Sequence, residues 1–214
     1  MKVLCKSAEF TECKKQVGDP VKIIYAGGLY LNRWKVLAKL AKVLDEINCD
    51  GIKAQLHIFS GSKLGKRKEK KLNDGKNSFL LGQISYEDLT ERYKSFDIAV
   101  HVESFDLKNR LITRLSFSTK IIDCLSSGCA VLAIGPSIQG GISYLKENDA
   151  AVCVTDLKEL KLAVSNLVTH FDVIEEYSQK ANILGMKNHQ KEEIEKNLRQ
   201  DFHDVVTGSI QQQY

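Results

Sequence analysis

A short segment in the middle of the chain, Ser118-Thr119-Lys120, combines residue types that bind phosphate. We expect a helix over residues 119–127 with Ser118 as its N-cap, because a serine hydroxyl accepts hydrogen bonds from the free amides of a first helical turn. Those amides and the helix dipole attract phosphate, and Lys120 adds a full positive charge. The alternative is a capped helix whose lysine faces water.

Two glycines mark a second candidate site, the turn Gly27-Gly28 after an expected strand at residues 21–26. Glycine lets a ligand approach the backbone closely, and Arg33 and Lys35 stand where the next helix begins, as candidate phosphate ligands. The turn lacks the G-x-G-x-x-G spacing of dinucleotide-binding proteins, and no acidic residue closes a second strand about 20 residues later. The pattern disfavours a dehydrogenase, and an ordinary turn with solvated basic residues is the alternative.

A third group of charges begins at Lys63, which follows another expected strand and could reach a phosphate. The basic run 63–71 suits an anionic lipid surface, although a solvated loop is the alternative interpretation. His101 is expected near the same edge of the sheet and is interpreted as structural. Spacing assembles no Ser-His-Asp triad and no metal-ligand cluster, so no catalytic residue is assigned and no metal or cofactor is expected.

The elements that position these residues alternate between short β-branched runs and amphipathic stretches at helical spacing. This pattern predicts an α/β fold, a doubly wound, mostly parallel six-stranded sheet with helices on both faces and a helical tail. Strands are expected at residues 21–26, 54–60, 79–81, 98–102, 130–133 and 151–154. Helices are expected at residues 33–47, 86–96, 119–127, 157–169, 173–184 and 192–206. Residues 103–116 are predicted to form a long loop, and such loops are often functional.

The composition is that of an ordinary globular chain of 214 residues, 43% hydrophobic and 27% charged. A net charge of +4 is too small to indicate nucleic-acid binding. Six cysteines without a C-x-x-C pair are interpreted as reduced thiols of a cytosolic protein. The sequence shows no signal peptide and no apolar run near the ~18 residues of a membrane span. We expect a cytoplasmic protein, with the basic run as its candidate contact with the inner membrane face.

The run Ser118-x-Lys120-Ile121-Ile122-Asp123-x-Leu125-x-x-Gly128 resembles the donor-binding region of GT-B glycosyltransferases, particularly the bacterial family 4 enzymes (glycosyl transferase group 1) of capsule and lipopolysaccharide synthesis. Three further markers stand in the same order as in that family: Tyr25-x-Gly27-x-Leu29 with Arg33, Phe59-x-Gly61, and Gly82-Gln83-Ile84. The resemblance covers about residues 21–170. It implies that Gly28 and Arg33 lie at the donor phosphates and that the backbone at Gln83 and Ile84 receives the nucleotide base.

In that family two acids eight positions apart commonly flank the phosphate-binding turn, and the second grips the ribose hydroxyls. Asp123 matches the second acid, but Leu115 stands in the place of the first, which contacts the sugar. Glu103 or Asp106 are candidate substitutes, and a surface charge is the alternative reading of Asp106. The pair Gly140-Gly141 matches a turn that contacts the sugar or its neighbourhood, and Tyr144 replaces the acid that often follows it.

The resemblance divides the chain into a nucleotide-sugar-binding domain at 21–170, C-terminal helices at 171–214 and a linker at 1–20 from a missing N-terminal domain. It implies transfer of a sugar from an NDP-sugar, with a UDP-sugar as the expected donor, to a saccharide or lipid-linked acceptor in cell-surface polysaccharide synthesis. Arg33, Lys35 and Lys120 would stabilise the leaving diphosphate. Without an acceptor domain, we expect weak donor binding and no transfer. A nucleotide-sugar epimerase and a non-catalytic donor-binding subunit of a two-chain transferase are the alternatives.

Overall fold

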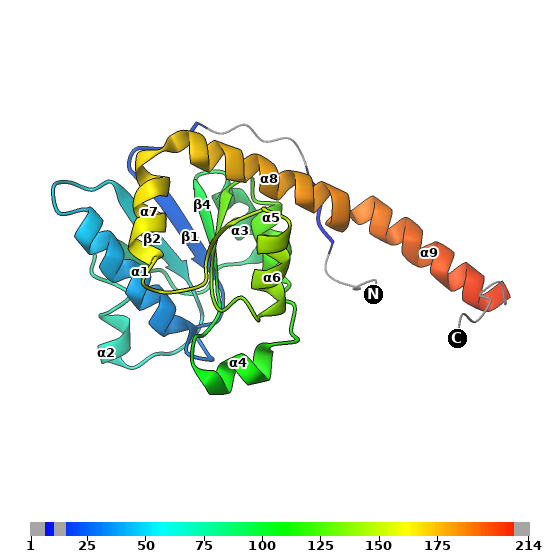
Figure 1. The fold of residues 1–214 in the computed structure, drawn as a ribbon, viewed down its shortest axis with the longest axis horizontal. Coiled ribbons are helices and arrows are strands. Elements are labelled where there is room, and N and C mark those ends of the chain that lie inside the picture. The colour runs from blue at the N-terminus through cyan, green and yellow to red at the C-terminus, as the bar shows by residue number, and fades with distance from the viewer. Residues whose placement is uncertain (1–6, 11–15, 208–214) are drawn as a thin grey trace.

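Six parallel strands form one sheet in the order β3-β2-β1-β4-β5-β6 (Figure 1). The computed structural model describes residues 7–10 and 16–207, so the expectations for Cys5, Cys13 and the rest of residues 1–6 and 11–15 lie outside the described residues. The strands are β1 (Val21–Ala26), β2 (Ala54–Phe59), β3 (Ser78–Leu80), β4 (Ile98–Val102), β5 (Ala130–Ile134) and β6 (Val152–Val154). The predicted doubly wound α/β class is confirmed, with a sheet that is wholly parallel.

Helices cover both faces of this sheet. In chain order they are α1 (Arg33–Ile47), α2 (Lys66–Glu69), α3 (Tyr86–Tyr93), α4 (Leu107–Thr113), α5 (Lys120–Leu125), α6 (Gly140–Glu147), α7 (Leu160–Thr169), α8 (Phe171–His189) and α9 (Lys191–Thr207). Successive strand residues face opposite layers, so Ile23 packs in one apolar cluster with α1 and α7, and Ile24 in another with α3, α5 and α6. All residues of β4 and β5 are buried, which explains their continuous apolar sequence.

Asp97 joins the two central strands at the amino end of the sheet. Its carboxylate accepts hydrogen bonds from Gly18 N at 3.0 Å and from Lys22 N at 2.7 Å. Its own backbone amide donates to Lys22 O, and its carbonyl accepts from Ala130 N, each at 2.9 Å. One residue before β4 therefore fixes how β1, β4 and β5 begin.

Helix α8 crosses the amino end of β5 from one layer to the other. Its Ile174 packs with the α1 and α7 cluster, whereas Ala181 and Leu184 pack with the opposite one. Because α8 runs to His189, the expected break after residue 184 is wrong. The break was predicted at Gly185, but this glycine lies inside the helix and makes room for the Phe10 ring. A Cβ on Gly185 would lie 1.9 Å from that ring.

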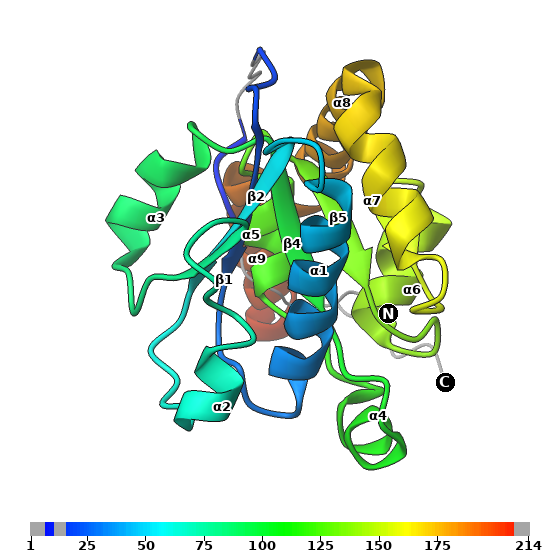
Figure 2. The ribbon, with the colours of Figure 1, turned by 90° about the vertical axis from the view of Figure 1, so that its left-hand side faces the viewer.

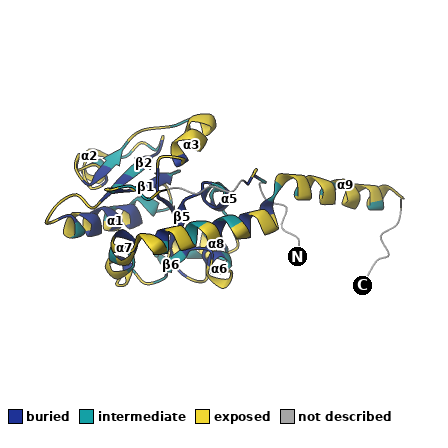
Figure 3. Ribbon diagram, turned by 90° about the horizontal axis from the view of Figure 1, so that it is seen from above, coloured by how far each residue is buried: buried dark blue, intermediate teal, exposed yellow. Residues whose placement is uncertain are grey.

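The described residues of the predicted linker also lie against α8 and α9. Ala8 N donates to His189 O at 3.2 Å, and Lys191 N donates to Ala8 O at 3.1 Å. Helix α9 buries none of its residues and extends away from the sheet (Figures 1 and 3). The domain boundaries themselves stay a prediction. Across the described chain, no helix combines the length and apolarity needed to span a membrane.

The region 103–116 is not the long loop that was predicted, because it contains α4. Asp106 caps this helix, its Oδ1 accepting from Asn109 N at 3.1 Å. The sequence pattern does not predict this helix, because Leu107, Leu111 and Ile112 are all more than half exposed. A helix whose aliphatic residues face solvent has no apolar stripe matched to a core.

Candidate functional site

The carboxyl end of the sheet between β1 and β4 is where the strand order reverses. β1 pairs with β2 on one side and with β4 on the other, so the connections that leave β1 and β4 run to opposite sides. Ligands of open α/β sheets bind in the crevice at such a point. Figure 2 shows α2, α4 and the first turn of α1 at the same end of the molecule.

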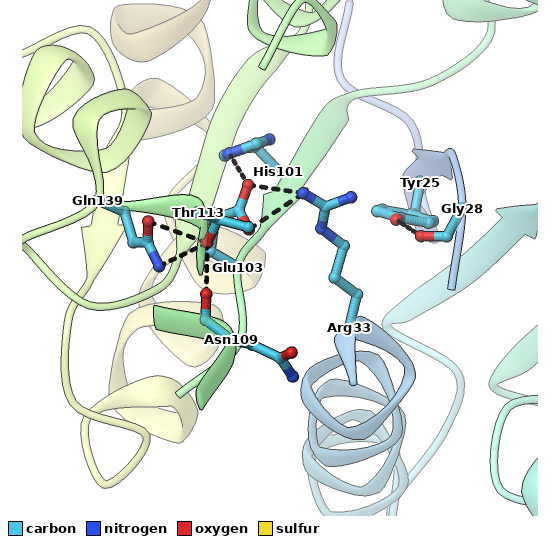
Figure 4. A network of polar contacts seen from close by, with 8 residues as sticks. All are labelled: Tyr25, Gly28, Arg33, His101, Glu103, Asn109, Thr113 and Gln139. Atoms are coloured by element: carbon cyan, nitrogen blue, oxygen red, sulfur yellow. Dashed lines mark hydrogen bonds and ion pairs between the residues drawn. The ribbon is translucent and has the colours of Figure 1, made fainter. Parts of the chain in front are cut away.

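Hydrogen bonding and backbone conformation fix the glycine turn after β1. The Tyr25 hydroxyl donates to Gly28 O at 2.7 Å, and burial raises the Tyr25 pKa above its usual range. Leu31 and Asn32 follow with φ of 55° and 60°, a left-handed conformation that residues other than glycine seldom adopt. α1 then begins at Arg33, whose side chain points toward the end of β4 (Figure 4).

The segment before α5 differs from its prediction. α5 begins at Lys120, and Thr119 takes the N-cap position without a side-chain hydrogen bond, so the assignment of Ser118 as N-cap is wrong. The physical reason is a tight first turn, in which Ile121 N donates to Ser118 O at 3.1 Å and Ile122 N donates to Thr119 O at 3.2 Å. Within the described residues, the amides of Thr119 and Lys120 make no hydrogen bond and are available to an anion.

Lys120 lies against the glycine turn of β1. A Cβ on Gly27 would lie 2.8 Å from Lys120 Cε, closer than such atoms approach, so only glycine leaves room for the lysine stem in this position. Arg33, His101, Ser118 and Lys120 help to line one cavity of about 10 Å³, room for about one water molecule. The structure thus brings the predicted Arg33, Ser118 and Lys120 together.

Arg33, which helps to line this cavity, forms a buried ion pair (Figure 4). Arg33 Nη2 donates to both oxygens of Glu103, at 2.9 and 3.1 Å, and the two side chains are 11% and 9% exposed. His101 Nε2 lies 3.5 Å from Glu103 Oε1 but makes no hydrogen bond, and Arg33 Nε is likewise buried without one. The arginine assigned to phosphate is therefore held by a carboxylate here.

Burial dominates the electrostatics of this group. It lowers the pKa of His101 to about 3, and the charges of Arg33 and Lys120 act in the same direction, so the imidazole is neutral at pH 7. Burial also raises the pKa of Glu103 and outweighs the lowering by Arg33. The site contains an arginine–glutamate pair, a neutral imidazole and the further cation of Lys120.

A second polar network ties α4 to this end of the sheet. Asp106 accepts a hydrogen bond from Ser104 Oγ and another from Asn32 Nδ2 at 3.1 Å; with Ser104 as the main cause, these bonds lower the Asp106 pKa. At the other end of α4, Gln139 Nε2 donates to Thr113 Oγ1 at 3.0 Å (Figure 4). Asp106, a candidate for the missing acid, is thus engaged in holding α4.

The residues predicted at the nucleotide base lie in a separate, open hollow between β2, β3 and α3. Its lining includes Phe59, Leu81, Gln83, Ile84 and Arg92. Gln83 faces the end of β2, where a Cβ on Gly61 would lie 3.0 Å from Gln83 Oε1. The Arg92 guanidinium lies 5.6 Å from the centre of the Phe59 ring. Because Phe59 is itself buried, the hollow offers a ligand the Arg92 guanidinium, the Gln83 amide and the apolar side chains of Leu81 and Ile84.

The other predicted ligands lie outside the small cavity. Lys35, Lys63 and Thr119 are exposed and Asp123 is half-buried in the first turn of α5. Their roles stay predictions. Within the described residues, no group of three or more His, Cys, Asp or Glu side chains could hold a metal ion.

Gly140 and Gly141 are the first two residues of α6, and their predicted contact with the sugar or its neighbourhood stays a prediction. A Cβ on Gly141 would lie 2.4 Å from Ile121 Cδ1, so this glycine lets α5 and α6 approach each other. Tyr144, in the place of the family's acid, has its hydroxyl 2.8 Å from His189 Nε2. Gly141 and Tyr144 therefore have packing contacts within the chain.

The sequence did not predict the pairing of Glu103 with Arg33. It did place His101 at the carboxyl edge of the sheet, but not the lack of a hydrogen-bond partner for its Nε2 atom. The paired residues stand 70 positions apart, so no local spacing reveals the contact. The available signal was that each follows a strand of a parallel sheet, whose carboxyl ends meet at one edge.

No protein-family model matches the sequence, and no curated protein sequence matches it. Solved structures are similar to it. A variant of TarM from S. aureus, in complex with fondaparinux, alpha-GlcNAc-glycerol and UDP, matches with a TM-score of 0.71 and 14% identity over 91% of this chain and 38% of its own. WaaG, a glycosyltransferase involved in lipopolysaccharide biosynthesis, matches with a TM-score of 0.60 and 15% identity. The match covers 90% of this chain and 48% of the WaaG chain.

The pneumococcal O-GlcNAc transferase GtfA, in complex with UDP and GlcNAc, matches with a TM-score of 0.66 and 13% identity over 94% of this chain and 38% of its own. At such identities the likeness shows the fold alone, a Rossmann-like domain of the kind that forms one half of the GT-B fold. The chain spans less than half the length of these three structures.

Proposed function

We propose that this chain binds the nucleoside diphosphate of a nucleotide-sugar donor, as the donor side of a glycosyltransferase. The donor is a UDP-sugar, and the acceptor is a saccharide or lipid-linked acceptor of cell-surface polysaccharide synthesis. One observation carries the proposal: the glycine turn, Ser118 and Lys120 meet at the switch point of a sheet with a glycosyltransferase fold. Two of the similar structures contain UDP, which supports the choice of base.

The diphosphate binds at the mouth of the small cavity, because the cavity itself holds about one water molecule. There it meets the amides of Thr119 and Lys120 and the ammonium of Lys120. When the bond between the sugar and the diphosphate breaks, negative charge grows on the leaving oxygen. Donors and cations already in place stabilise that charge without reorganisation. Lys35 and Lys63, both exposed, add positive charge at the surface.

The base occupies the open hollow at Gln83 and Ile84, and Asp123 accepts hydrogen bonds from the ribose hydroxyls. The exposed Leu81 and Gln83 and the Arg92 guanidinium supply apolar and hydrogen-bonding surfaces for a pyrimidine. Transfer is assigned to the complete enzyme, since this chain spans only 38% of the TarM variant and 38% of GtfA.

Calorimetric titration of the chain with UDP, GDP and their sugars tests the proposal. We expect UDP to bind. Asp123→Ala should raise the Kd for UDP about tenfold, because it removes a hydrogen bond to a charged group. Asp172→Ala, an exposed acid in the first turn of α8, is the matched control and should bind UDP like the wild type. Absence of binding by every nucleotide, in a sample shown to be folded, would refute the donor-side assignment.

A further inference from the structure

We propose that α2 and α4 together form a docking surface for a bilayer of anionic lipids. The inference goes beyond the proposed function, and its test needs no nucleotide. Both elements lie at the lower end of the molecule in Figures 1 and 2. Because a turn about the vertical axis relates these two views, the lower end is the same in both. One flat surface can therefore contact α2 and α4 at once.

Helix α4 is attached to the protein by its polar side. The buried Asn109 donates from Nδ2 to Asp106 Oδ2 at 2.7 Å, and Thr113, one turn later, accepts from Gln139. The sides away from this contact carry aliphatic residues that are 55% to 89% exposed, namely Leu107, Leu111, Ile112 and, beyond the end of the helix, Leu115. A helix of a globular protein normally buries such residues. A group of exposed aliphatic side chains with polar surroundings marks a binding surface.

The charges around these aliphatic residues are positive. At about 100° per residue, Lys108 and Arg114 flank the stripe formed by Leu107 and Leu111, one on each side. Both cations are exposed, and no acidic residue stands between Asp106 and Asp123. An amphipathic helix with this composition lies in the interface of a membrane, where its aliphatic residues enter the acyl boundary and its cations meet the headgroups.

The second part of the surface is the α2 basic cluster, which consists of Lys63, Lys66, Arg67, Lys68, Lys70 and Lys71. All six side chains are exposed. Leu64 packs against the core and Leu72 is fully buried, so leucines anchor the segment near both of its ends. Within the described residues, none of the six cations forms an ion pair with a carboxylate. Their charge is therefore available to an external anion.

Charge and composition favour a bilayer over a protein partner. Protein interfaces are depleted of lysine, and their fully buried centres are depleted of charged residues. An anionic leaflet attracts every lysine or arginine near its surface, and clusters of about four to eight such residues are typical of lipid binding. The α2 basic cluster falls in that range. A surface that is both anionic and able to receive aliphatic side chains satisfies α2 and α4 together.

Cosedimentation with sucrose-loaded vesicles tests the electrostatic part. We expect binding to mixed phosphatidylglycerol and phosphatidylcholine vesicles, none to phosphatidylcholine alone, and weaker binding as salt rises. The triple variant Lys66→Gln, Lys70→Gln, Lys71→Gln should lower the partition coefficient about 100-fold, which is about fivefold per charge. The control triple variant, Lys187→Gln, Lys191→Gln, Lys196→Gln, removes the same charge from exposed lysines of α8 and α9. It should lower the partition coefficient by less than about threefold, because these lysines lie away from the docking surface.

A second pair of variants tests the apolar part. Leu111→Ser with Ile112→Ser removes two exposed side chains of α4 and should lower the partition coefficient at least about tenfold. Leu162→Ser with Ile183→Ser, at similarly exposed positions of α7 and α8, is the control and should leave vesicle binding unchanged. If the α4 pair does not fold, Leu115→Ser replaces it and should lower vesicle binding severalfold.

Each outcome decides the inference. It is overturned if the wild type binds no vesicles, if it binds neutral and anionic vesicles equally, or if either control loses as much binding as its test variant. Unchanged vesicle binding by the α4 variant also overturns it. In that case, loss of a dimer measured by light scattering would assign the apolar side of α4 to a second copy of the chain. None of the variants changes a residue of the proposed donor site, so UDP binding tests the proposed function separately.

Discussion

Lys120 provides the sharpest test of the phosphate site. Its stem lies against Gly27 and its charge helps to depress the pKa of the buried His101, so the ammonium acts in a partly desolvated crevice. A hydrogen bond to a charged group contributes about 1.5–3 kcal/mol, whereas an exposed ion pair contributes about 0.2–1 kcal/mol. Because Lys120 is half-buried, Lys120→Ala should cost about 1.5–2 kcal/mol, a rise of about 10- to 30-fold in the Kd for UDP.

Calorimetry at two salt concentrations measures this loss. The wild-type affinity should fall more steeply with salt than that of Lys120→Ala, because screening acts on the charge that the variant lacks. Lys187→Ala removes an exposed lysine of α8 and controls for the general effect of net charge. If Lys120→Ala and Lys187→Ala bind UDP within about twofold of each other, Lys120 does not contact the diphosphate and the assignment of this site is wrong.

Three further predictions concern packing and protonation. Gly27→Ala places a methyl group 2.8 Å from Lys120 Cε; it should weaken UDP binding by displacing the lysine while shifting the thermal midpoint by less than about 2 °C, and unchanged affinity would contradict this. His101 has a native pKa of about 3 against about 6.5 unfolded, so the unfolded state binds more protons between these values. The contribution of His101 to stability is therefore complete above pH 6.5 and falls with acidification by at most about 1.4 kcal/mol per pH unit. In urea unfolding, the unfolding free energy of His101→Phe should fall less steeply with acidification than that of the wild type. An equal dependence on pH in both proteins would show that His101 does not cause the acid destabilisation. Gly185→Ala meets the Phe10 ring at 1.9 Å and should lower the unfolding free energy by about 1–3 kcal/mol, measured by urea unfolding beside the exposed control Lys187→Ala.

The sheet was predictable because strands that are buried on both faces have continuous apolar sequences. β4 and β5 are fully buried and read as unbroken apolar runs, and glycine or polar turns separate them from the helices. α4 was not predictable in this way, because Leu107 and Ile112 face solvent and the helix is held by Asp106 and Thr113. Hydrogen bonds from single side chains leave no periodic signal.

The site was predictable in outline but not in its contacts. Because Arg33 and Lys120 are phosphate-binding residue types that follow the ends of parallel strands, the sequence predicted that both lie at one edge of the sheet. The cap at Ser118 was misassigned because a serine before a helix suits both an N-cap and the tight turn that the structure contains. The hold of Glu103 on Arg33 depends on how β1 and β4 lie side by side, which a local pattern does not encode.

The strand order also has a kinetic consequence. β1 meets β2 across a single helix, but β1 meets β4 only when residues about 75 positions apart come together, as the bond between Lys22 and Asp97 records. Closing so long a loop slows assembly more than local pairing does. The crevice lies across that junction, so a partly folded β1-β2-β3 unit has no binding site for nucleotide. Appearance of UDP binding during refolding should therefore report the long-range closure of the sheet, and ligand should stabilise only chains that have completed it.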